Sequence, residues 1–307
     1  MRRILVPLDG SPLSETAIPY ARALARGPDC EICLLSVWEV LPEELETVGP
    51  DHAKTLRQQG EQYFTTYLGN IAQAIEAPVS IEVRSGHPAF EILLAAAEIG
   101  PDLIVMASHG RRGPTQRRRG SIADKVLRGC TCPVLIVGPD ILRRREPPAA
   151  AVQSLLVPLD GSAESETALD VALETARLTG GQITLLRVVP PRVAEDGGAG
   201  AYPPDLETHL VKSARGYLKR FKVAHPERIV STVVERGRPA EAIVEFARQI
   251  SPDLVVMSSR SRYGRGRWAL GSVADDVIEG PVPVILVHPE AGAQESHGPI
   301  AYQAQAG

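Results

Sequence analysis

Two segments of this sequence combine residue types that could bind a ligand. The first ends an apolar run at Asp9-Gly10, which presents a carboxylate and backbone groups. The second runs from Ala107 to Gly120-Ser121 and contains the arginines Arg111, Arg112, Arg117, Arg118 and Arg119. A glycine turn that leads into a helix offers backbone N–H groups and the positive end of the helix dipole. This chemistry suits a phosphate group.

Both segments occur twice, 151 residues apart. Asp9 corresponds to Asp160, and Gly120-Ser121 corresponds to Gly271-Ser272. The second copy of the loop contains the arginines Arg260, Arg262, Arg265 and Arg267. A repeat of this length predicts two copies of one domain and is too long for a solenoid. Because both copies share these features, we favour an anion site over the alternative, in which the arginines form a solvated face and the glycines only serve turns.

Alternating strands and helices must position these segments. Short apolar runs predict strands at residues 3–8, 30–40, 79–84, 103–106 and 134–137. Capping residues and helical spacing predict helices from the N-cap Ser11 to residue 26, at 51–76, from Pro88 onward and at 121–128. Strands without in–out alternation predict a parallel sheet covered on both faces. Both candidate segments then lie at carboxyl ends of strands, where such sheets bind ligands.

The second half repeats this plan, with strands near residues 154–159, 182–189, 228–235, 253–257 and 284–287. We therefore expect an α/β protein with two tandem, doubly wound domains, each with a five-stranded parallel sheet. The expected boundaries are residues 1–142 for the first domain, 143–151 for a linker, 152–289 for the second domain and 290–307 for a disordered tail. The segment 190–204 is predicted to be a long, loose loop.

Composition and charge limit the classes of function. The 307 residues are 44% hydrophobic, and the formal net charge is −4. This composition is ordinary for a soluble globular protein. The charge gives no global field that would attract nucleic acid or an acidic membrane. The N-terminal apolar run stops at Leu8, too early for a signal peptide or a membrane span. We expect a cytoplasmic protein that binds neither nucleic acid nor membrane.

Other sequence motifs that could indicate a different function are absent or weak. The sequence has no G-x-x-x-x-G-K-[ST] phosphate loop. The G-x-G-x-x-A match at Gly264 follows the fourth strand instead of the first, so we interpret it as chance. Ser11 is explained as an N-cap, and neither copy repeats a catalytic triad. The odd spacing of Cys30 and Cys33 places them on opposite faces of a strand, which favours buried thiols over a metal or redox pair. No catalytic or metal-binding residue is assigned.

Taken together, the repeated segments resemble the universal stress protein family. The resemblance covers residues 3–137 and 154–287. It rests on VPLDGS at the first strand–helix turn and on the family's ATP pattern of Gly, two residues, Gly, nine residues, Gly and Ser or Thr. It implies a Rossmann-like, adenine nucleotide alpha hydrolase-like fold that binds ATP, with or without Mg²⁺. In ATP-binding members the aspartate region holds the adenosine, the end of strand two backs the adenine, and the glycine loop holds the triphosphate.

Carried over by position, the resemblance implies nucleotide-binding residues in both halves. Those of the first half are Pro7, Leu8, Asp9, Val37, Met106, Ala107, His109, Gly110, Gly120, Ser121 and Ile122. Those of the second half are Pro158, Asp160, Val188, Met257, Gly271, Ser272 and Val273. Both halves depart from the glycine pattern, at Ala107 in the first and at Ser258 and Ser261 in the second. A Cβ at a glycine position with positive φ costs about 1 kcal/mol, so we expect the first half to be the better site.

The leading hypothesis is a stress-response regulatory protein in which ATP or a related adenine nucleotide biases a conformation or an interface. Two alternatives stay open. One is an adaptor protein with vestigial sites, and the other is a slow ATP hydrolase, although no general base is assigned beside the phosphate loop. The resemblance also implies that the last strands, residues 134–137 and 284–287, pair in an antiparallel way across the two halves. The chain would then be an intramolecular pseudo-dimer, and a homodimer of whole chains stays open.

Overall fold

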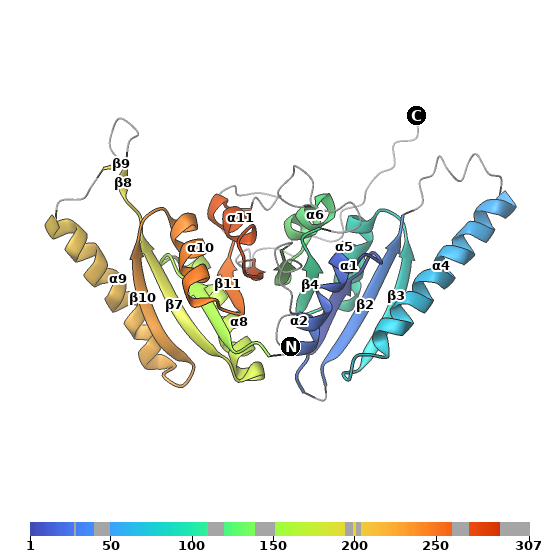
Figure 1. The fold of residues 1–307 in the computed structure, drawn as a ribbon, viewed down its shortest axis with the longest axis horizontal. Helices are drawn as coiled ribbons and strands as arrows, with labels where there is room; N and C mark the ends of the chain where they lie inside the picture. The colour runs from blue at the N-terminus through green and yellow to red at the C-terminus, as the bar shows by residue number, and fades with distance from the viewer. Residues whose placement is uncertain are drawn as a thin grey trace, which may run out of the picture.

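Ten strands form one continuous sheet in the computed structural model (Figure 1). The first half contributes β1 (Arg3–Pro7), β2 (Glu31–Trp38), β3 (Val79–Ser85), β4 (Leu103–Ala107) and β5 (Val134–Val137). The second half contributes β6 (Ser154–Pro158), β7 (Gln182–Val189), β10 (Ile229–Arg236), β11 (Leu254–Ser258) and β12 (Val284–Val287). The strand order is β10-β7-β6-β11-β12-β5-β4-β1-β2-β3. Within each half, all strand pairs of this ten-stranded sheet are parallel, which confirms the two predicted five-stranded parallel sheets.

The structure describes most of the chain, in the ranges 1–27, 29–39, 50–109, 120–138, 151–193, 199–200, 204–259 and 270–288. Several predictions lie outside these ranges, namely those for the linker 143–150, the tail 290–307, Gly110, Ser261 and all nine arginines of the two glycine loops. In the described ranges, no helix combines the length and the apolar character that crossing a bilayer requires.

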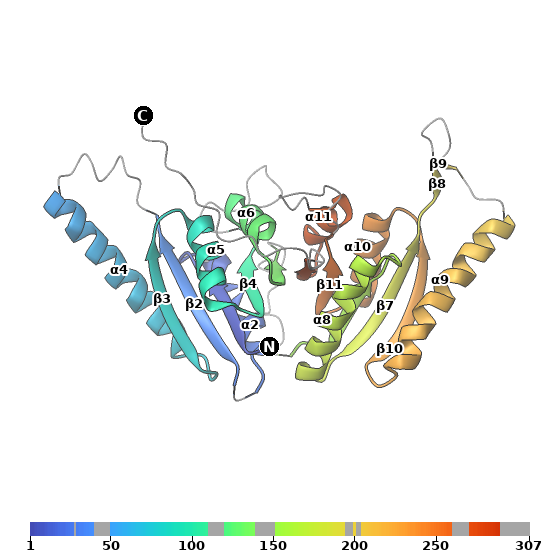
Figure 2. The ribbon, with the colours of Figure 1, turned by 180° about the vertical axis from the view of Figure 1, so that it is seen from behind.

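Helices cover both faces of the sheet. Those of the first half are α1 (Pro12–Glu15), α2 (Ile18–Leu24), α4 (Pro50–Ala72), α5 (Pro88–Ile99) and α6 (Ser121–Gly129). Those of the second half are α8 (Ala163–Thr179), α9 (Pro204–Ala224), α10 (Pro239–Ile250) and α11 (Ser272–Ile278). The long helices α4 and α9 lie at the two outer edges of the molecule, while α6 and α11 lie near its centre (Figures 1 and 2).

Two apolar layers form the core, one on each face of the sheet. Along β1, Ile4 and Val6 belong to the layer under α2 and α4, whereas Leu5 belongs to the layer under α5 and α6. This alternation is what a strand buried on both faces requires. Each layer contains residues of both halves. The hydrophobic core is therefore continuous across the centre of the molecule.

The two halves meet along an antiparallel strand pair. Strand β5 pairs with β12, and the central pair in the register joins Leu135 to Ile285. Helices α2 and α8 are in contact beside this pair, and the N-terminal ammonium group of Met1 lies 2.6 Å from Glu174 Oε1. The predicted antiparallel contact between the last strands is confirmed. Neither of these two strands is left as an open edge, which removes a site of unwanted pairing.

The predicted helix from residue 12 to 26 is wrong in one respect, because it is interrupted. Helix α1 ends at Glu15 and α2 begins at Ile18, with Pro19 in the first turn of α2. Proline has no N–H group to donate to the carbonyl four residues earlier, so a continuous helix would lose that hydrogen bond. The second half has Asp170 at this position, and α8 runs without a break.

Two other predicted segments differ in detail. The helix predicted at 51–76 ends at Ala72. The loose loop predicted at 190–204 contains a small antiparallel ladder between β8 (Arg192–Val193) and β9 (Ala199–Gly200). Neither difference changes the sheet or the residues at the carboxyl ends of its strands.

Candidate functional site

The carboxyl ends of β1 and β4 form the candidate site of the first half. Strand β1 pairs with β2 on one side and with β4 on the other, so the strand order reverses between β1 and β4. A doubly wound sheet opens a crevice for ligands at such a point. Asp9 follows β1 here, and Ser108 and His109 follow β4. The structure thus brings together the two segments that the sequence singled out.

Asp9 stabilises the turn after β1. Its Oδ1 accepts hydrogen bonds from the backbone N–H of Ser11 at 3.0 Å and from the Ser11 hydroxyl at 2.5 Å. Ser11 in turn caps the N-terminus of α1. Asp160 and Ser162 repeat both bonds at the same distances. Ser11 is confirmed as an N-cap, and the aspartate of the repeated motif holds the local backbone in place.

The N-terminus of α6 has a different kind of cap. Its N-cap is Gly120, and no side chain caps the helix there. The Gly120 N–H donates to the Ser108 carbonyl at 2.9 Å, and a Cβ on Gly120 would lie 2.9 Å from that oxygen. Only glycine fits this approach. The first turn of an α-helix has N–H groups without intrahelical partners, so α6 can offer them to an anion such as phosphate.

His109 lies beside this helix start and is 5% exposed. Its Nδ1 is 3.0 Å from the Ser108 hydroxyl. Its Nε2 is buried and has no hydrogen-bond partner within the part of the chain that the structure describes. A buried polar atom of this kind is costly unless a ligand, water or ion satisfies it. The imidazole is therefore a candidate ligand contact next to α6.

Apolar side chains complete the site on one face of the sheet. Val37, Met106 and Ile122 pack in or against the same core layer, under α5 and α6. Leu8 does not join them, because its side chain belongs to the opposite layer. Its backbone N–H donates to the Leu35 carbonyl at 2.8 Å. Pro7 and Ala107 are buried at the ends of β1 and β4. Ser121 is exposed at the start of α6.

The second half has a related but poorer arrangement. Val188, Met257 and Val273 pack in or against the same layer as their first-half counterparts. The remaining assigned residues are Pro158, Asp160, Gly271 and Ser272, at the ends of β6 and the start of α11. Gly271 is an N-cap without a side-chain bond, as Gly120 is, but α11 has only seven residues. A shorter helix presents a weaker dipole to an anion.

Sequence reasoning missed the role of the repeated Pro-Asp-Leu motif. The Asp102 carboxylate accepts the backbone N–H groups of Arg2 and Arg3 at the start of β1. Asp253 does the same in the second half, with the N–H groups of Gln153 and Ser154 at 2.8 Å each. Repetition at the 151-residue offset was the available signal, but the partners lie about 100 residues away along the chain. These aspartates tie strands together at the end of the sheet opposite the candidate site.

Doubly wound sheets with a glycine-capped helix at the switch point define a Rossmann-like α/β protein. The model of the universal stress protein family matches residues 1–138 and 151–288. The chain therefore belongs to the universal stress protein family and contains two tandem copies of its domain. Among the described residues, no cluster of three or more metal-ligand side chains is placed to hold a metal ion.

The chain is similar in sequence to bacterial proteins and in fold to a solved archaeal structure. A universal stress protein of Mycobacterium tuberculosis is 31% identical over 234 residues, which cover 74% of this chain and 76% of that one. A second from the same organism is 27% identical over 308 residues and covers 92% and 94%. The crystal structure of a universal stress protein from Archaeoglobus fulgidus superposes with a TM-score of 0.68 at 23% identity, over 94% and 98% of the two chains.

Proposed function

We propose that this chain is a stress-response regulatory protein that binds ATP or a related adenine nucleotide, mainly in its first half. The observation that carries the proposal is the start of α6, where Gly120 leaves the first helical turn without a side-chain cap. The buried Nε2 of His109 lies beside it, without a partner among the described residues. Both features suit a phosphate chain, which has many acceptor oxygens and negative charge.

The residues of the first half divide into two roles. The N–H groups at Ser121 and Ile122, with His109, would hold phosphates. Val37, near the end of β2, would back the base, as the family resemblance implies, and Met106 would line the site in the same core layer. Family membership supports this division, and the convergence of these residues at one switch point supports it further. The arginines of the loop lie outside the described residues, and their part in phosphate binding stays a prediction.

A single negative charge at the start of α6 tests the proposal. Ser121 is exposed, so Ser121→Asp should fold normally, and an acidic residue in the first turn favours the helix dipole. The new carboxylate would repel the phosphates. At a few ångströms the repulsion is about 1–4 kcal/mol, which corresponds to at least about fivefold weaker ATP binding. Ser272→Asp at the same place in the second half is the matched control and should change ATP binding little.

Calorimetric titration measures the affinity of both variants and of the unmodified chain for ATP and for adenosine. We expect Ser121→Asp to weaken ATP and to leave adenosine unchanged. No ATP binding by the unmodified chain would favour the adaptor alternative. Equal losses for ATP and adenosine would show that α6 does not bind the phosphates, and a larger loss in Ser272→Asp would move the main site to the second half.

A further inference from the structure

Each half contains the same hydrogen bond between a glutamate and a tyrosine. Tyr67 on α4 donates its hydroxyl to Glu15 Oε1 at 3.0 Å. Tyr217 on α9 donates to Glu166 Oε1 at the same distance. Burial, with the nearby glutamate, raises the pKa of Tyr217 to about 12 and that of Tyr67 as well. Both hydroxyls therefore stay protonated and act as donors, and Oε1 of each glutamate is the acceptor.

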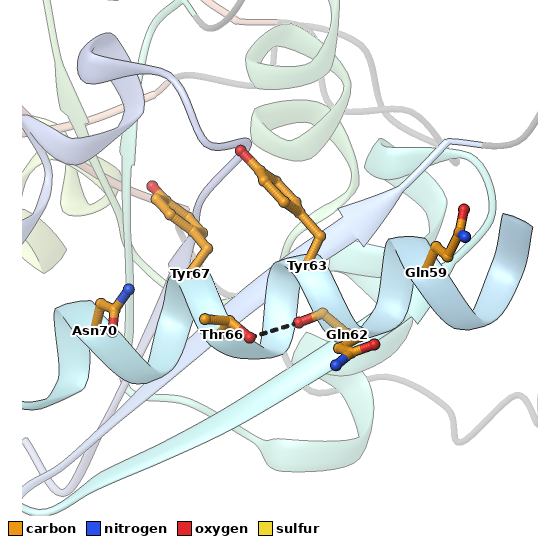
Figure 3. Close-up of a pocket in the computed structure, with 6 residues that line it drawn as sticks. All are labelled: Gln59, Gln62, Tyr63, Thr66, Tyr67 and Asn70. Carbon is orange, nitrogen blue, oxygen red and sulfur yellow. Dashed lines mark hydrogen bonds between the residues drawn. The ribbon is translucent and has the colours of Figure 1, made fainter.

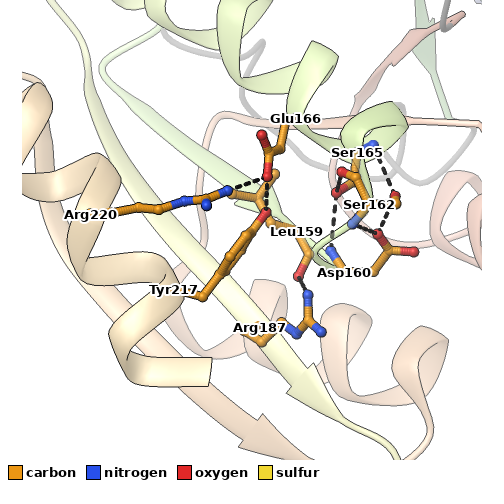
Figure 4. A network of polar contacts seen from close by, with 8 residues as sticks. All are labelled: Leu159, Asp160, Ser162, Ser165, Glu166, Arg187, Tyr217 and Arg220. Carbon is orange, nitrogen blue, oxygen red and sulfur yellow. Dashed lines mark hydrogen bonds and ion pairs between the residues drawn. The ribbon is translucent and has the colours of Figure 1, made fainter. Parts of the chain in front are cut away.

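In the second half this pair belongs to a filled guanidinium site (Figure 4). Arg220 Nη2 donates to Glu166 Oε1 at 2.5 Å. The Arg220 guanidinium carbon lies 4.5 Å from the ring centroid of Tyr217 and 4.6 Å from that of Phe221. Arg187 approaches the Tyr217 ring at 5.3 Å. A carboxylate and aromatic faces together are what a guanidinium group prefers.

The first half keeps the glutamate and the tyrosine but lacks both arginines. Three residues after the tyrosine it has Asn70, where the second half has Arg220. At the position of Arg187 it has Ser36, whose hydroxyl is turned to the Leu8 carbonyl at 2.8 Å. Within the described ranges, no side chain forms an ion pair with Glu15. The acceptor and the aromatic ring are thus present without the cation that fills the other copy.

A groove lies at Asn70, the position that corresponds to Arg220 of the second half. Two adjoining hollows of about 490 and 420 Å³ share Tyr67 and Asn70 in their walls. The first follows the exposed side of α4 (Figure 3), and its other lining residues are Gln59, Gln62, Tyr63 and Thr66. The second reaches α2 and α1, and its other lining residues are Glu15, Ile18, Arg22, Ile71, Ala74 and Ile75. The groove therefore combines one carboxylate, tyrosine rings and side-chain amides.

We propose that this groove binds the arginine side chain of a partner protein, with its guanidinium group in the position that Arg220 occupies in the second half. Along α4 the groove runs from residue 59 to residue 71, which is about 18 Å at the helical rise and longer than a single amino acid. Tyr63 is 60% exposed in it, and exposed tyrosines are enriched at protein interfaces. The lining contains one carboxylate, Glu15, so it can pair with one guanidinium group, and the positive charge of Arg22 disfavours a segment with several basic residues.

The first experiment compares two blocked tripeptides, Ac-Ala-Arg-Ala-NH₂ and its citrulline analogue, which has nearly the same shape without the charge. The whole chain with labelled tyrosine rings is titrated with each peptide and followed by NMR. We expect the arginine peptide to shift the Tyr67 and Tyr63 resonances and the citrulline peptide to leave them in place. Equal shifts with both peptides, or none with either, would overturn the proposal. If blocked arginine alone binds as tightly as the tripeptide, the inference that the ligand belongs to a protein is wrong.

Reciprocal exchange between the halves provides the matched variants. Asn70→Arg supplies an internal guanidinium and should abolish peptide binding. Arg220→Asn should open a second site, so that the chain binds two peptides instead of one. Glu15→Gln keeps an acceptor for Tyr67 but removes the charge, and should weaken binding at least about tenfold.

These variants also separate this proposal from nucleotide binding. Circular dichroism checks their folding, and ATP affinity should be unchanged in all three, because none of the altered residues lies at the switch point. Unaltered peptide binding in both Asn70→Arg and Glu15→Gln would refute the site even if ATP binding is confirmed. If Asn70→Arg does not fold, Glu15→Gln and Arg220→Asn still decide the outcome.

Discussion

At the scale of single residues, many polar side chains that repeat between the halves hold the backbone. Asp9 and Asp160 bind the turns after β1 and β6, and Asp102 and Asp253 bind the strand starts at the other end of the sheet. These carboxylates accept backbone N–H groups that would otherwise lack partners. Repetition in the sequence therefore marks structural roles as readily as ligand contacts.

Asp102 should make the stability of the fold depend on acidic pH. Burial favours its neutral form, but the N–H groups of Arg2 and Arg3 outweigh this and hold the pKa of Asp102 below its ordinary value. A lowered folded-state pKa gives a contribution that is fully present above the unfolded-state pKa, near 3.9, and that is lost as the pH falls through the folded-state value. Asp102→Asn should cost about 1 kcal/mol at pH 7, a small value because the carboxyl is largely exposed.

Urea denaturation at pH 7 and pH 3 measures this difference. The cost of Asp102→Asn should shrink at pH 3, where the carboxyl of the unmodified chain approaches protonation. Asp170→Asn, on the exposed side of α8, is the control and should be nearly neutral at both values. A cost that stays the same at both pH values would contradict the assigned role.

The four cysteines should differ in oxidation. Cys130 and Cys132 have their sulfur atoms 3.0 Å apart, and the Cys132 thiol lowers the pKa of Cys130. Burial raises the pKa of Cys30 and Cys33, which pack in opposite core layers. The thiolate is the reactive form, so diamide should join Cys130 to Cys132 first.

Peptide mapping by mass spectrometry checks this order of oxidation. We expect the Cys130–Cys132 peptide to lose two hydrogen atoms while Cys30 and Cys33 remain reduced. Cys132→Ser should prevent this loss. A disulfide between Cys30 and Cys33 in the folded chain would show that the assignment to opposite faces is wrong.

At the scale of elements, two equivalent helix ends differ by one residue type. Helix α5 ends at Gly100 with φ +61°, and α10 ends at Ser251 with φ +45°. Glycine adopts this conformation at little cost, whereas other residues pay about 1 kcal/mol. Ser251→Gly should therefore stabilise the chain by up to about 1 kcal/mol, and Gly100→Ser should destabilise it similarly.

Thermal denaturation of Ser251→Gly and Gly100→Ser measures the sign of the stability change in each variant. A Cβ on Gly100 meets no atom within 4 Å, so the effect should come from the backbone conformation and not from a clash. Destabilisation by Ser251→Gly would show that the serine hydroxyl, which donates to the Arg248 carbonyl at 3.3 Å, outweighs the cost of the left-handed backbone.

Most elements of the fold were predictable because local signals agree with the tertiary structure. Apolar runs placed all ten strands of the main sheet, and Ser11 as an N-cap placed the start of α1. Pro19 also indicated the break before α2, but helical spacing on both sides of it favoured one continuous helix. The signals that failed are those that depend on distant partners. Neither the orphan nitrogen of His109 nor the groove beside Tyr67 has a signature within its own segment.

At the scale of the whole molecule, the central strand pair joins two domains into one sheet. Leu135 and Ile285 are fully buried there, and both core layers continue from one half to the other. Two domains joined in this way should unfold together, because separation would expose the apolar strands of both. We therefore expect the central strand pair and the shared core layers to hold the halves together even without the covalent connection.

Cleavage of the linker tests this conclusion. A protease site inserted between residues 138 and 151 should yield two fragments that elute together from a size-exclusion column and melt in one transition. Leu135→Asp should then separate or unfold them, because a buried charge without a partner costs several kcal/mol. Ile81→Asp, on the outer strand β3 where Ile81 is 40% exposed, is the control and should leave the cleaved halves associated. If the two fragments separate after cleavage without any substitution, the strand pair and the shared core do not hold the halves together.

The antiparallel pairing of β5 with β12 gives the chain the geometry of a two-fold dimer without its genetic constraint. In a dimer of identical subunits each substitution appears twice, so an arginine that fills one groove fills both. Here Arg220 fills one copy while Asn70 leaves the other open. In a duplicated chain, one copy can therefore keep its internal arginine for structural support, while the other copy can change its groove so that it binds a partner. If the open groove binds its arginine, one molecule has the division of labour that otherwise needs two different subunits.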